Sequence, residues 1–300
     1  MWVLVYGCGV IGSLLVHELC SVGNQAAVIG RGTWKDVLSR DGLWIRHVLQ
    51  HQETVDHPLV MEKAADHVEF DLVFSVMQSC QQEKILDQLA AVNSGMVVLV
   101  GNNPLCAEME ATIHSLSPHK QVLFDFLNSA GVREKTYVKS LHSKKVELLL
   151  GGVHGMRQER DQILVSAAFG GSGCKLTWCD DMEGYLYTHA AFVPPCACLC
   201  YGKGCDLRKA DCRDIQLTVE AAKEGYRLIE KAGMKIWPAE DEKYDQGRSW
   251  QILMNVMLWG IAKTRIALIN FAIRCPHGTG CCRFTVSETI DQEEGMDLTM

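Results

Sequence analysis

Three glycines near the start of the chain have the types and spacing that phosphate binding requires. They lie in the run GCGVIG, between an apolar stretch at 3–6 and a helical pattern, SLLVHELCSVG. Gly7 allows a sharp turn out of the strand, Gly9 lets the backbone approach a pyrophosphate, and Gly12 lets the helix pack closely on the sheet. The free N–H groups at the helix start then attract the phosphates.

A second apolar strand follows at 26–30, so the glycines stand in the strand–turn–helix–strand context in which this motif is informative. The motif predicts a dinucleotide site, and a glycine-rich turn that binds nothing is the alternative. The expected cofactor-binding residues in this turn are Gly7, Cys8, Gly9, Val10, Ile11 and Gly12.

The residue after the second strand indicates which dinucleotide is bound. NAD-binding proteins usually place Asp or Glu there to accept a hydrogen bond from the ribose 2′-hydroxyl. This chain reads VIGRGTW, with no acid and with Arg31 at the strand end. A guanidinium matches a 2′-phosphate in charge and geometry. We therefore expect NADP(H) rather than NAD(H), with a solvated surface arginine as the other interpretation of Arg31.

Polar side chains follow two further apolar strands, expected at 70–76 and 95–101. Gln78 comes after the first, and the pair Asn102 and Asn103 comes after the second. Ligands of an open parallel sheet bind beyond the carboxyl ends of its strands, so we expect these amides at the cofactor edge. Asn102 can orient a ribose or a substrate by hydrogen bonds, or it can simply form a turn.

A second group of candidate residues lies in EGYLYTHAAFVPP, residues 183–195, where His189 stands beside Thr188. An imidazole changes its charge near neutral pH and can donate a proton to a ketone oxygen. Tyr185 and Tyr187 are further possible donors. A hydrogen-bonded core histidine is the alternative interpretation of His189.

The elements that must position these residues alternate between strand and helix in the first half of the chain. Apolar runs predict strands at 3–6, 26–30, 70–76, 95–101, 121–126 and 146–151. A helical pattern such as that at 83–92 falls between several of them, so we expect an α/β fold with a doubly wound, mostly parallel sheet.

Helical patterns replace the strands in the second half, notably at 214–236 and 249–264. The later helix is apolar nearly all round, so we expect it to be buried. The expected domains are a Rossmann NADP-binding domain over 1–157 and a helical substrate domain over 158–300. A substrate is expected in the cleft between two such domains.

Composition excludes several classes of protein. The chain has 300 residues, 48% of them apolar, and a formal net charge of −7, so nucleic acid and anionic membrane are not expected partners. We see no leader and no apolar run of the roughly 20 residues that a membrane span needs, and we expect a cytoplasmic protein.

In such a protein, the 14 cysteines are expected to be reduced thiols. Cys196, Cys198, Cys200, Cys205 and Cys212 lack a C-x-x-C pair, so core packing is favoured over metal binding, and no metal is expected.

Taken in order, these segments resemble the ketopantoate reductase (2-dehydropantoate 2-reductase) family over about residues 1–265. The resemblance rests on VLVYGCGVIGSLL, VIGRG, DLVFSVMQSCQ, VVLVGNNPL, VLFDFLNSAG and YLYTHAAFVPPCACLCY. It implies a Rossmann domain with a helical domain, NADPH as hydride donor, and reduction of 2-dehydropantoate to (R)-pantoate in pantothenate biosynthesis. It also implies that Arg31 binds the 2′-phosphate and that Asn102 lies near the nicotinamide and the substrate.

The resemblance fails at the positions of the family's catalytic residues. Tyr185 and His189 stand where the family has lysine and, four residues on, asparagine, and the expected glutamate falls near Arg265. Gln78 replaces a lysine. The last 25 or so residues also depart from the family. The resemblance therefore implies a divergent member with His189, Asn102 and Tyr185 as candidate catalytic residues.

Two functions from different classes fit this sequence. The first is an NADPH-dependent reductase of a 2-oxo acid or related ketone, with Lys263 or Arg265 available to bind the substrate carboxylate. The second is a catalytically inactive NADP(H)-binding protein that acts through a partner. In either case, exposed apolar surface on the helical domain would favour a homodimer.

Overall fold

A computed structural model of the chain describes residues 1–263, except for 66, 156–158, 205, 239–240 and 246–247. The chain divides into two compact units, Met1–Glu183 and Gly184–Met300. Each unit is described by itself.

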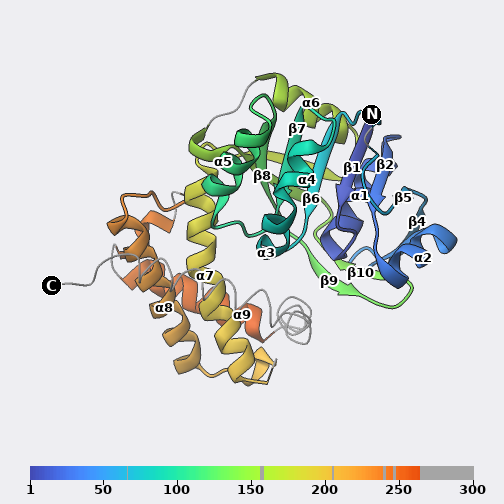
Figure 1. The fold of residues 1–300 in the computed structure, drawn as a ribbon. Coiled ribbons are helices and arrows are strands. Elements are labelled where there is room, and N and C mark those ends of the chain that lie inside the picture. Colours follow the sequence, from blue (N-terminus) through green and yellow to red (C-terminus); the bar gives the residue numbers. More distant parts are fainter. Residues whose placement is uncertain (66, 156–158, 205, 239–240, 246–247, 264–300) are drawn as a thin grey trace. The chain divides into compact units, whose positions relative to one another are not determined.

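The first unit is built on a sheet of eight strands (Figure 1). The strands are β1 (Trp2–Tyr6), β2 (Gln25–Ile29), β5 (Leu59–Met61), β6 (Leu72–Val76), β7 (Met96–Val100), β8 (Gln121–Leu127), β11 (Val146–Gly151) and β12 (Cys174–Trp178). Their order is β12-β11-β8-β7-β6-β1-β2-β5, and every neighbouring pair is parallel except β11 with β8. The predicted doubly wound, mostly parallel sheet is confirmed, with all six predicted strands present.

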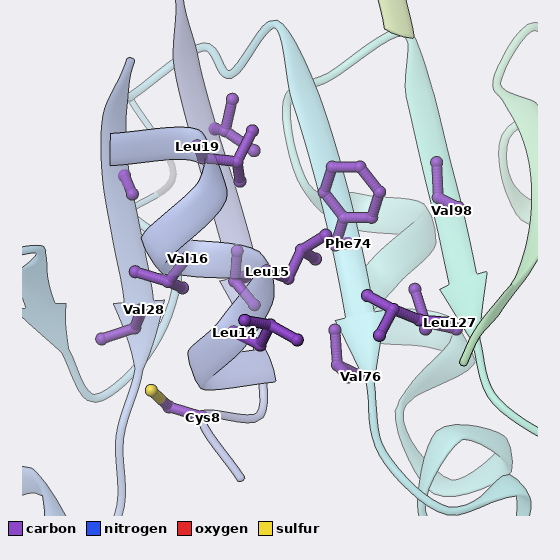
Figure 2. Close-up of a cluster of buried hydrophobic side chains, with 14 of the residues drawn as sticks. Cys8, Leu14, Leu15, Val16, Leu19, Val28, Phe74, Val76, Val98 and Leu127 are labelled. Carbon is purple, nitrogen blue, oxygen red and sulfur yellow. The ribbon is translucent and has the colours of Figure 1, made fainter. Parts of the chain in front are cut away.

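Helices of the first unit pack on this sheet. They are α1 (Val10–Ser21), α2 (Gly32–Asp41), α3 (Ser79–Gln82), α4 (Leu86–Ala91), α5 (Cys106–Leu116) and α6 (Glu159–Phe169), with short 3₁₀ turns at Glu83–Ile85 and Val153–Gly155. Figure 2 shows the apolar side of α1, where Leu14, Leu15 and Leu19 are fully buried against strand residues that include Val28 and Phe74. Each buried leucine contributes about 1.5–3 kcal/mol, so this contact fixes the helix that follows the glycine turn.

A smaller sheet, which the sequence did not predict, also packs against α1. Its strands are β3 (Leu43–His47), β4 (Gln52–Asp56), β9 (Ala130–Arg133) and β10 (Val138–Leu141), in the order β4-β3-β10-β9. Strand β3 alternates between buried and exposed residues, as expected of a sheet with one solvated face. A Cβ atom on Gly131 would lie 2.9 Å from Cγ1 of Val10, so β9 runs beside the first residue of α1.

The first unit extends beyond the expected boundary near residue 157. Strand β12 pairs in parallel with β11 and completes one edge of the large sheet, and α6 connects the two strands. These elements were expected in the helical domain. Because their contacts are with the sheet, the division falls after Glu183 instead.

The second unit is helical in the part that the structure describes, as predicted. Its helices are α7 (Met182–Gly202), α8 (Cys212–Lys231) and α9 (Arg248–Ala262), with 3₁₀ turns at Leu207–Lys209 and Asp241–Asp245. Helix α8 begins with a capping box, in which the Asp211 carboxylate accepts from the N–H of Asp214 (2.9 Å) and the Asp214 carboxylate accepts from the N–H of Asp211 (2.8 Å).

The core of the second unit is aromatic. Tyr226, Tyr244 and Trp250 meet edge to face, with ring centroids 5.4–6.3 Å apart, a favoured arrangement for aromatic pairs. Cys196 and Cys200 are buried in the same cluster.

The prediction that the helix at 249–264 is buried all round is wrong for the described part, α9. One face of this helix is buried, through Trp250, Met254, Leu258 and Ala262, at a spacing of four residues. The other face exposes Ile252, Leu253, Val256, Met257 and Trp259. None of the described helices combines the length and the apolar character that crossing a membrane requires.

Candidate functional site

The glycine turn has two positions that are closely packed and one that is open. Gly7 has φ +93°, and a Cβ on it would lie 2.3 Å from the carbonyl oxygen of Val76. A Cβ on Gly12 would lie 1.9 Å from the Gly7 oxygen, whereas a Cβ on Gly9 would meet no atom within 4 Å. Gly7 and Gly12 are therefore required by packing, and Gly9 faces free space next to the helix start.

That free space adjoins unpaired backbone donors. Gly9 is the N-cap residue of α1, and its carbonyl accepts from the N–H of Ser13 at 2.9 Å. The preceding N–H groups, those of Val10, Ile11 and Gly12, have no partners within the helix. The first turn contains no acidic residue that would neutralise them. This helix start can therefore bind a phosphate group.

Cys8 takes part in the turn through its backbone. Its thiol is buried 3.5 Å from Oγ of Ser13, and its carbonyl oxygen accepts a hydrogen bond of 2.7 Å from Nε1 of Trp34. Burial raises the pKa of the Cys8 thiol to about 11, although Ser13, Trp34 and Arg133 act in the opposite direction. The Cys8 side chain is thus a neutral, packed group.

Arg31 lies at the same edge of the sheet as the glycine turn. Tyr6 at the end of β1 pairs with Ile29 at the end of β2, so Gly7 and Arg31 both lie just beyond this edge. Arg31 is the exposed N-cap residue of α2, and no acidic side chain among the described residues pairs with it. Burial raises the pKa of Tyr6, and the charge of Arg31 partly offsets this rise. The guanidinium is therefore near the turn and available to an anion.

Gln78 and Asn102 follow the next two strands at this edge, since β6 pairs with both β1 and β7. Gln78 is the N-cap residue of α3, and its backbone N–H donates to Oε1 of Gln81 at 3.4 Å. It therefore has a structural role in starting this short helix. Gly101 precedes Asn102, and its N–H donates to the carbonyl oxygen of Asp125 on β8 (2.9 Å).

Buried polar atoms without partners gather at the carboxyl ends of these central strands. Among the described residues, Oδ1 of Asn102, both amide atoms of Asn103, and both carboxyl oxygens of Asp125 make no hydrogen bond. Asn103 and Asp125 are fully buried, and burial raises the pKa of Asp125 well above its usual value. Each such group costs about 1–3 kcal/mol unless water or a ligand satisfies it. These unsatisfied groups are buried at the edge of the sheet beyond which ligands of an open parallel sheet bind.

The residues expected to perform proton transfer lie in the second unit. Tyr185 and His189 are one helical turn apart on α7, and their rings stack with centroids 5.9 Å apart and an interplanar angle of 23°. Trp237 meets Tyr185 edge-on at 5.3 Å. Thr188 joins the same segments, because its hydroxyl donates to the Gly184 carbonyl (2.7 Å) and accepts from the N–H of Trp237 (3.1 Å).

The expected substrate-binding cations are less well supported. Nζ of Lys263 donates to the carbonyl oxygens of Arg208 and Ala210, each at 2.7 Å, and so stabilises the turn before α8. Arg265 lies outside the described residues.

Tyr187, the third candidate donor, packs against the core of the second unit. Within the described part of the chain, no three His, Cys, Asp or Glu side chains form a metal site.

The mostly parallel sheet, with a glycine turn between its first strand and first helix, defines a Rossmann-fold protein. Residues 3–153 match the sequence model of the family described as ketopantoate reductase PanE/ApbA. This match spans half of the chain, and the chain belongs to this family. It includes Gly7, Gly9, Gly12, Arg31 and Asn102, whereas Tyr185 and His189 lie beyond it.

Solved structures share this fold over nearly the whole chain. A 2-dehydropantoate 2-reductase from Methylococcus capsulatus is 17% identical (100% of this chain, 99% of that chain, TM-score 0.65). D-mandelate dehydrogenase with NADH and anilino(oxo)acetate is 13% identical (98% and 99%, TM-score 0.70). A dimeric ketopantoate reductase from Staphylococcus aureus is 10% identical (96% and 92%, TM-score 0.66). At these identities the likeness shows the fold, and no curated protein sequence matches the chain.

Proposed function

We propose that the protein is an NADPH-dependent reductase of a 2-oxo acid, as in the reduction of 2-dehydropantoate to (R)-pantoate for pantothenate biosynthesis. The observation that carries this proposal is the open position at Gly9, beside the unpaired N–H groups of α1, together with the unpaired guanidinium of Arg31. The D-mandelate dehydrogenase of the same fold, which holds NADH and anilino(oxo)acetate, supports a nicotinamide cofactor and a 2-oxo acid substrate.

Each residue at the sheet edge has a role in this proposal. The N–H groups of Val10, Ile11 and Gly12 bind the pyrophosphate, and Arg31 binds the 2′-phosphate. Asn102, with its unpaired Oδ1, orients the nicotinamide ribose or the substrate. Gln78 borders the cofactor while it caps α3. NADPH, when bound, supplies the hydride.

His189 is the proposed proton donor to the substrate oxygen. A ketone reduced by hydride needs a proton at its oxygen, and an imidazole can supply one near neutral pH. Stacking on Tyr185 restricts the rotation of the His189 ring. Tyr185 is itself the second candidate donor, since its phenol carries an ionisable proton.

The test is to mix the protein with NADPH and a panel of 2-oxo acids that includes 2-dehydropantoate, and to follow the absorbance of the reduced nicotinamide. We expect turnover with at least one of them. His189→Ala should lower kcat by about 10²- to 10⁴-fold and leave the Kd for NADPH unchanged. Turnover that survives in His189→Ala but fails in Tyr185→Phe would move the donor role to Tyr185.

A second candidate is an inactive NADP(H)-binding protein that acts through a partner. The observation that favours it is Tyr185, which stands where the family resemblance places the catalytic lysine and whose ring is packed between His189 and Trp237. Tight NADPH binding with no turnover of any 2-oxo acid would establish this candidate and exclude the reductase.

We also propose that the protein acts in the cytoplasm, as a homodimer. No disulfide joins the cysteines in the described part of the chain, which is the state that a reducing compartment maintains. The exposed apolar face of α9 and the dimeric reductase of the same fold support association of two copies. Light scattering should give a dimer mass that falls to the monomer mass in Leu253→Glu. A monomer in the wild-type protein would contradict the homodimer.

A further inference from the structure

Trp34 connects the glycine turn to the start of α2. It is the third residue of this helix, it is buried, and its Nε1 donates to the carbonyl oxygen of Cys8 at 2.7 Å. In a Rossmann fold the adenosine ribose lies between the glycine turn and the end of the second strand. The Trp34 ring spans these two elements and so borders that position.

Arg133 lies on the Trp34 ring. Its guanidinium carbon is 5.2 Å from a ring centroid of Trp34, and Arg133 is the exposed last residue of β9. Gly131, two residues earlier on the same face of β9, approaches Val10 at the start of α1. The small sheet thus brings a second guanidinium to the glycine turn from a distant part of the sequence.

This guanidinium has no acidic partner among the described residues. Glu134, the next residue, is bound instead to Lys139 at 2.8 Å. Arg46 in the same small sheet provides the contrast, because it also lies over an aromatic ring, that of Tyr137 at 4.9 Å, but its Nε is bound to Glu53 at 2.7 Å. Arg133 is held by its ring contact, and its charge remains available to an anion.

Arg31 and Arg133 therefore both reach the first turn of α2, one as its N-cap residue and the other through Trp34. A phosphate monoester carries a charge of about −1.5 to −2 at neutral pH, which one guanidinium only partly neutralises. We propose that Arg133 is the second cation of the 2′-phosphate site and that, with Arg31, it determines the preference for NADPH over NADH. This inference rests on the proposed function, since the protein must bind the nucleotide.

The experiment measures the Kd of the full chain for NADPH and for NADH by titration calorimetry. Arg133→Ala should weaken NADPH binding by about tenfold to a hundredfold, the loss expected for a charge-assisted hydrogen bond, and should change NADH binding by less than about twofold. Arg133→Lys, which keeps the charge without the planar fork, should give an intermediate loss. Arg46→Ala is the matched control and should leave both Kd values unchanged.

The variants separate failure of this inference from failure of the proposed function. If Arg31→Ala weakens NADPH binding and Arg133→Ala changes neither Kd, Arg133 is not part of the site and the inference is overturned. An equal loss of affinity for NADPH and NADH in Arg133→Ala also overturns the inference, because Arg133 would then contact a part of the cofactor that the two nucleotides share. If the wild-type protein binds neither nucleotide, the proposed function itself fails.

Discussion

A Cβ atom on Gly12 would lie 1.9 Å from the carbonyl oxygen of Gly7, whereas one on Gly9 would meet no atom within 4 Å. The same motif therefore contains a glycine that packing requires and a glycine that packing does not require, which is left for the proposed binding of a pyrophosphate. The two roles can be separated by identical substitutions.

We expect Gly12→Ala to destabilise the protein by at least about 2 kcal/mol, since the closely packed backbone must move. Gly9→Ala should leave the free energy of unfolding nearly unchanged and weaken NADPH binding by about tenfold or more, because its methyl group occupies the space that a pyrophosphate needs. Urea unfolding and nucleotide titration of both variants check this. Equal destabilisation by the two substitutions would contradict the assignment of Gly9 to binding.

Local sequence patterns were sufficient to predict the glycine turn and six of the eight strands of the large sheet, but not β5 and β12. Strands such as β7 are buried on both faces and read as unbroken apolar runs. The small sheet was missed because β4, with the sequence QETVD, is exposed or half-buried and has few apolar residues. The prediction that helix α9 is buried all round was wrong for the opposite reason. Its apolar residues surround the helix, although only one face is buried.

The sequence patterns did not indicate Trp34 and Arg133, because the contacts of these residues join segments that are distant in the sequence. Trp34 was visible in the sequence VIGRGTW, but its hydrogen bond to Cys8 joins residues 26 positions apart. Arg133 reaches the same place only because β9 belongs to the unpredicted sheet. Neither contact has a sequence pattern of its own, so the end of the second strand indicates Arg31 as a candidate, whereas no motif indicates Arg133.

Trp34→Phe should separate the hydrogen bond of Trp34 from its ring contact. Phenylalanine keeps an aromatic face for Arg133 but leaves the buried carbonyl of Cys8 without its donor. We expect a loss of about 1–3 kcal/mol in the free energy of unfolding. NADPH and NADH binding should weaken by the same factor, because the glycine turn is common to both. Selective loss of NADPH binding would show instead that the substitution disturbs Arg133.

Asp125 should make the protein less stable as the pH rises. Burial without a partner raises its pKa well above the usual value, so the folded state keeps a proton that the unfolded state releases above about pH 4. The free energy of unfolding then falls with rising pH, by at most about 1.4 kcal/mol per unit, until the pH passes the folded-state pKa.

Asp125→Asn removes this titration while keeping the shape of the side chain. The variant should gain stability over the wild-type protein, and the gain should grow between about pH 5 and pH 8. Asp87→Asn, on the exposed side of α4, is the control and should show no such trend. A difference between Asp125→Asn and wild type that stays constant with pH would show that Asp125 is ionised in the folded protein.

Three histidines of the first unit have fixed hydrogen-bonding roles. Nδ1 of His142 lies 2.8 Å from the carbonyl oxygen of Ser143, which only accepts, so this nitrogen carries a proton. In the neutral ring, Nε2 of His142 then accepts from Nδ1 of His47 at 2.9 Å, and Nε2 of His47 accepts from the Thr54 hydroxyl at 2.9 Å. Nδ1 of His17 donates to the Asp56 carboxylate at 2.8 Å.

The surroundings of His47 and His17 shift the pKa values of the two rings in opposite directions. Burial, followed by the charges of His17 and His142, lowers the pKa of His47 to about 4. Burial also favours neutral His17, but the hydrogen bond and charge of Asp56 outweigh it, and the pKa of His17 is raised. Protonated His17 therefore contributes its full stabilisation of the folded protein below about pH 6.5. A further fall in pH changes the stability of the protein through His47.

Between about pH 6.5 and pH 4 the unfolded chain binds a proton at His47 that the folded protein excludes, so stability should fall by up to about 1.4 kcal/mol per unit. His47→Gln cannot titrate and should lose less stability over this range than the wild-type protein, as measured by urea unfolding at a series of pH values. His119→Gln, at an exposed position, is the control and should follow the wild-type curve. If all three proteins lose stability equally, His47 is not the group that makes the fold sensitive to acid.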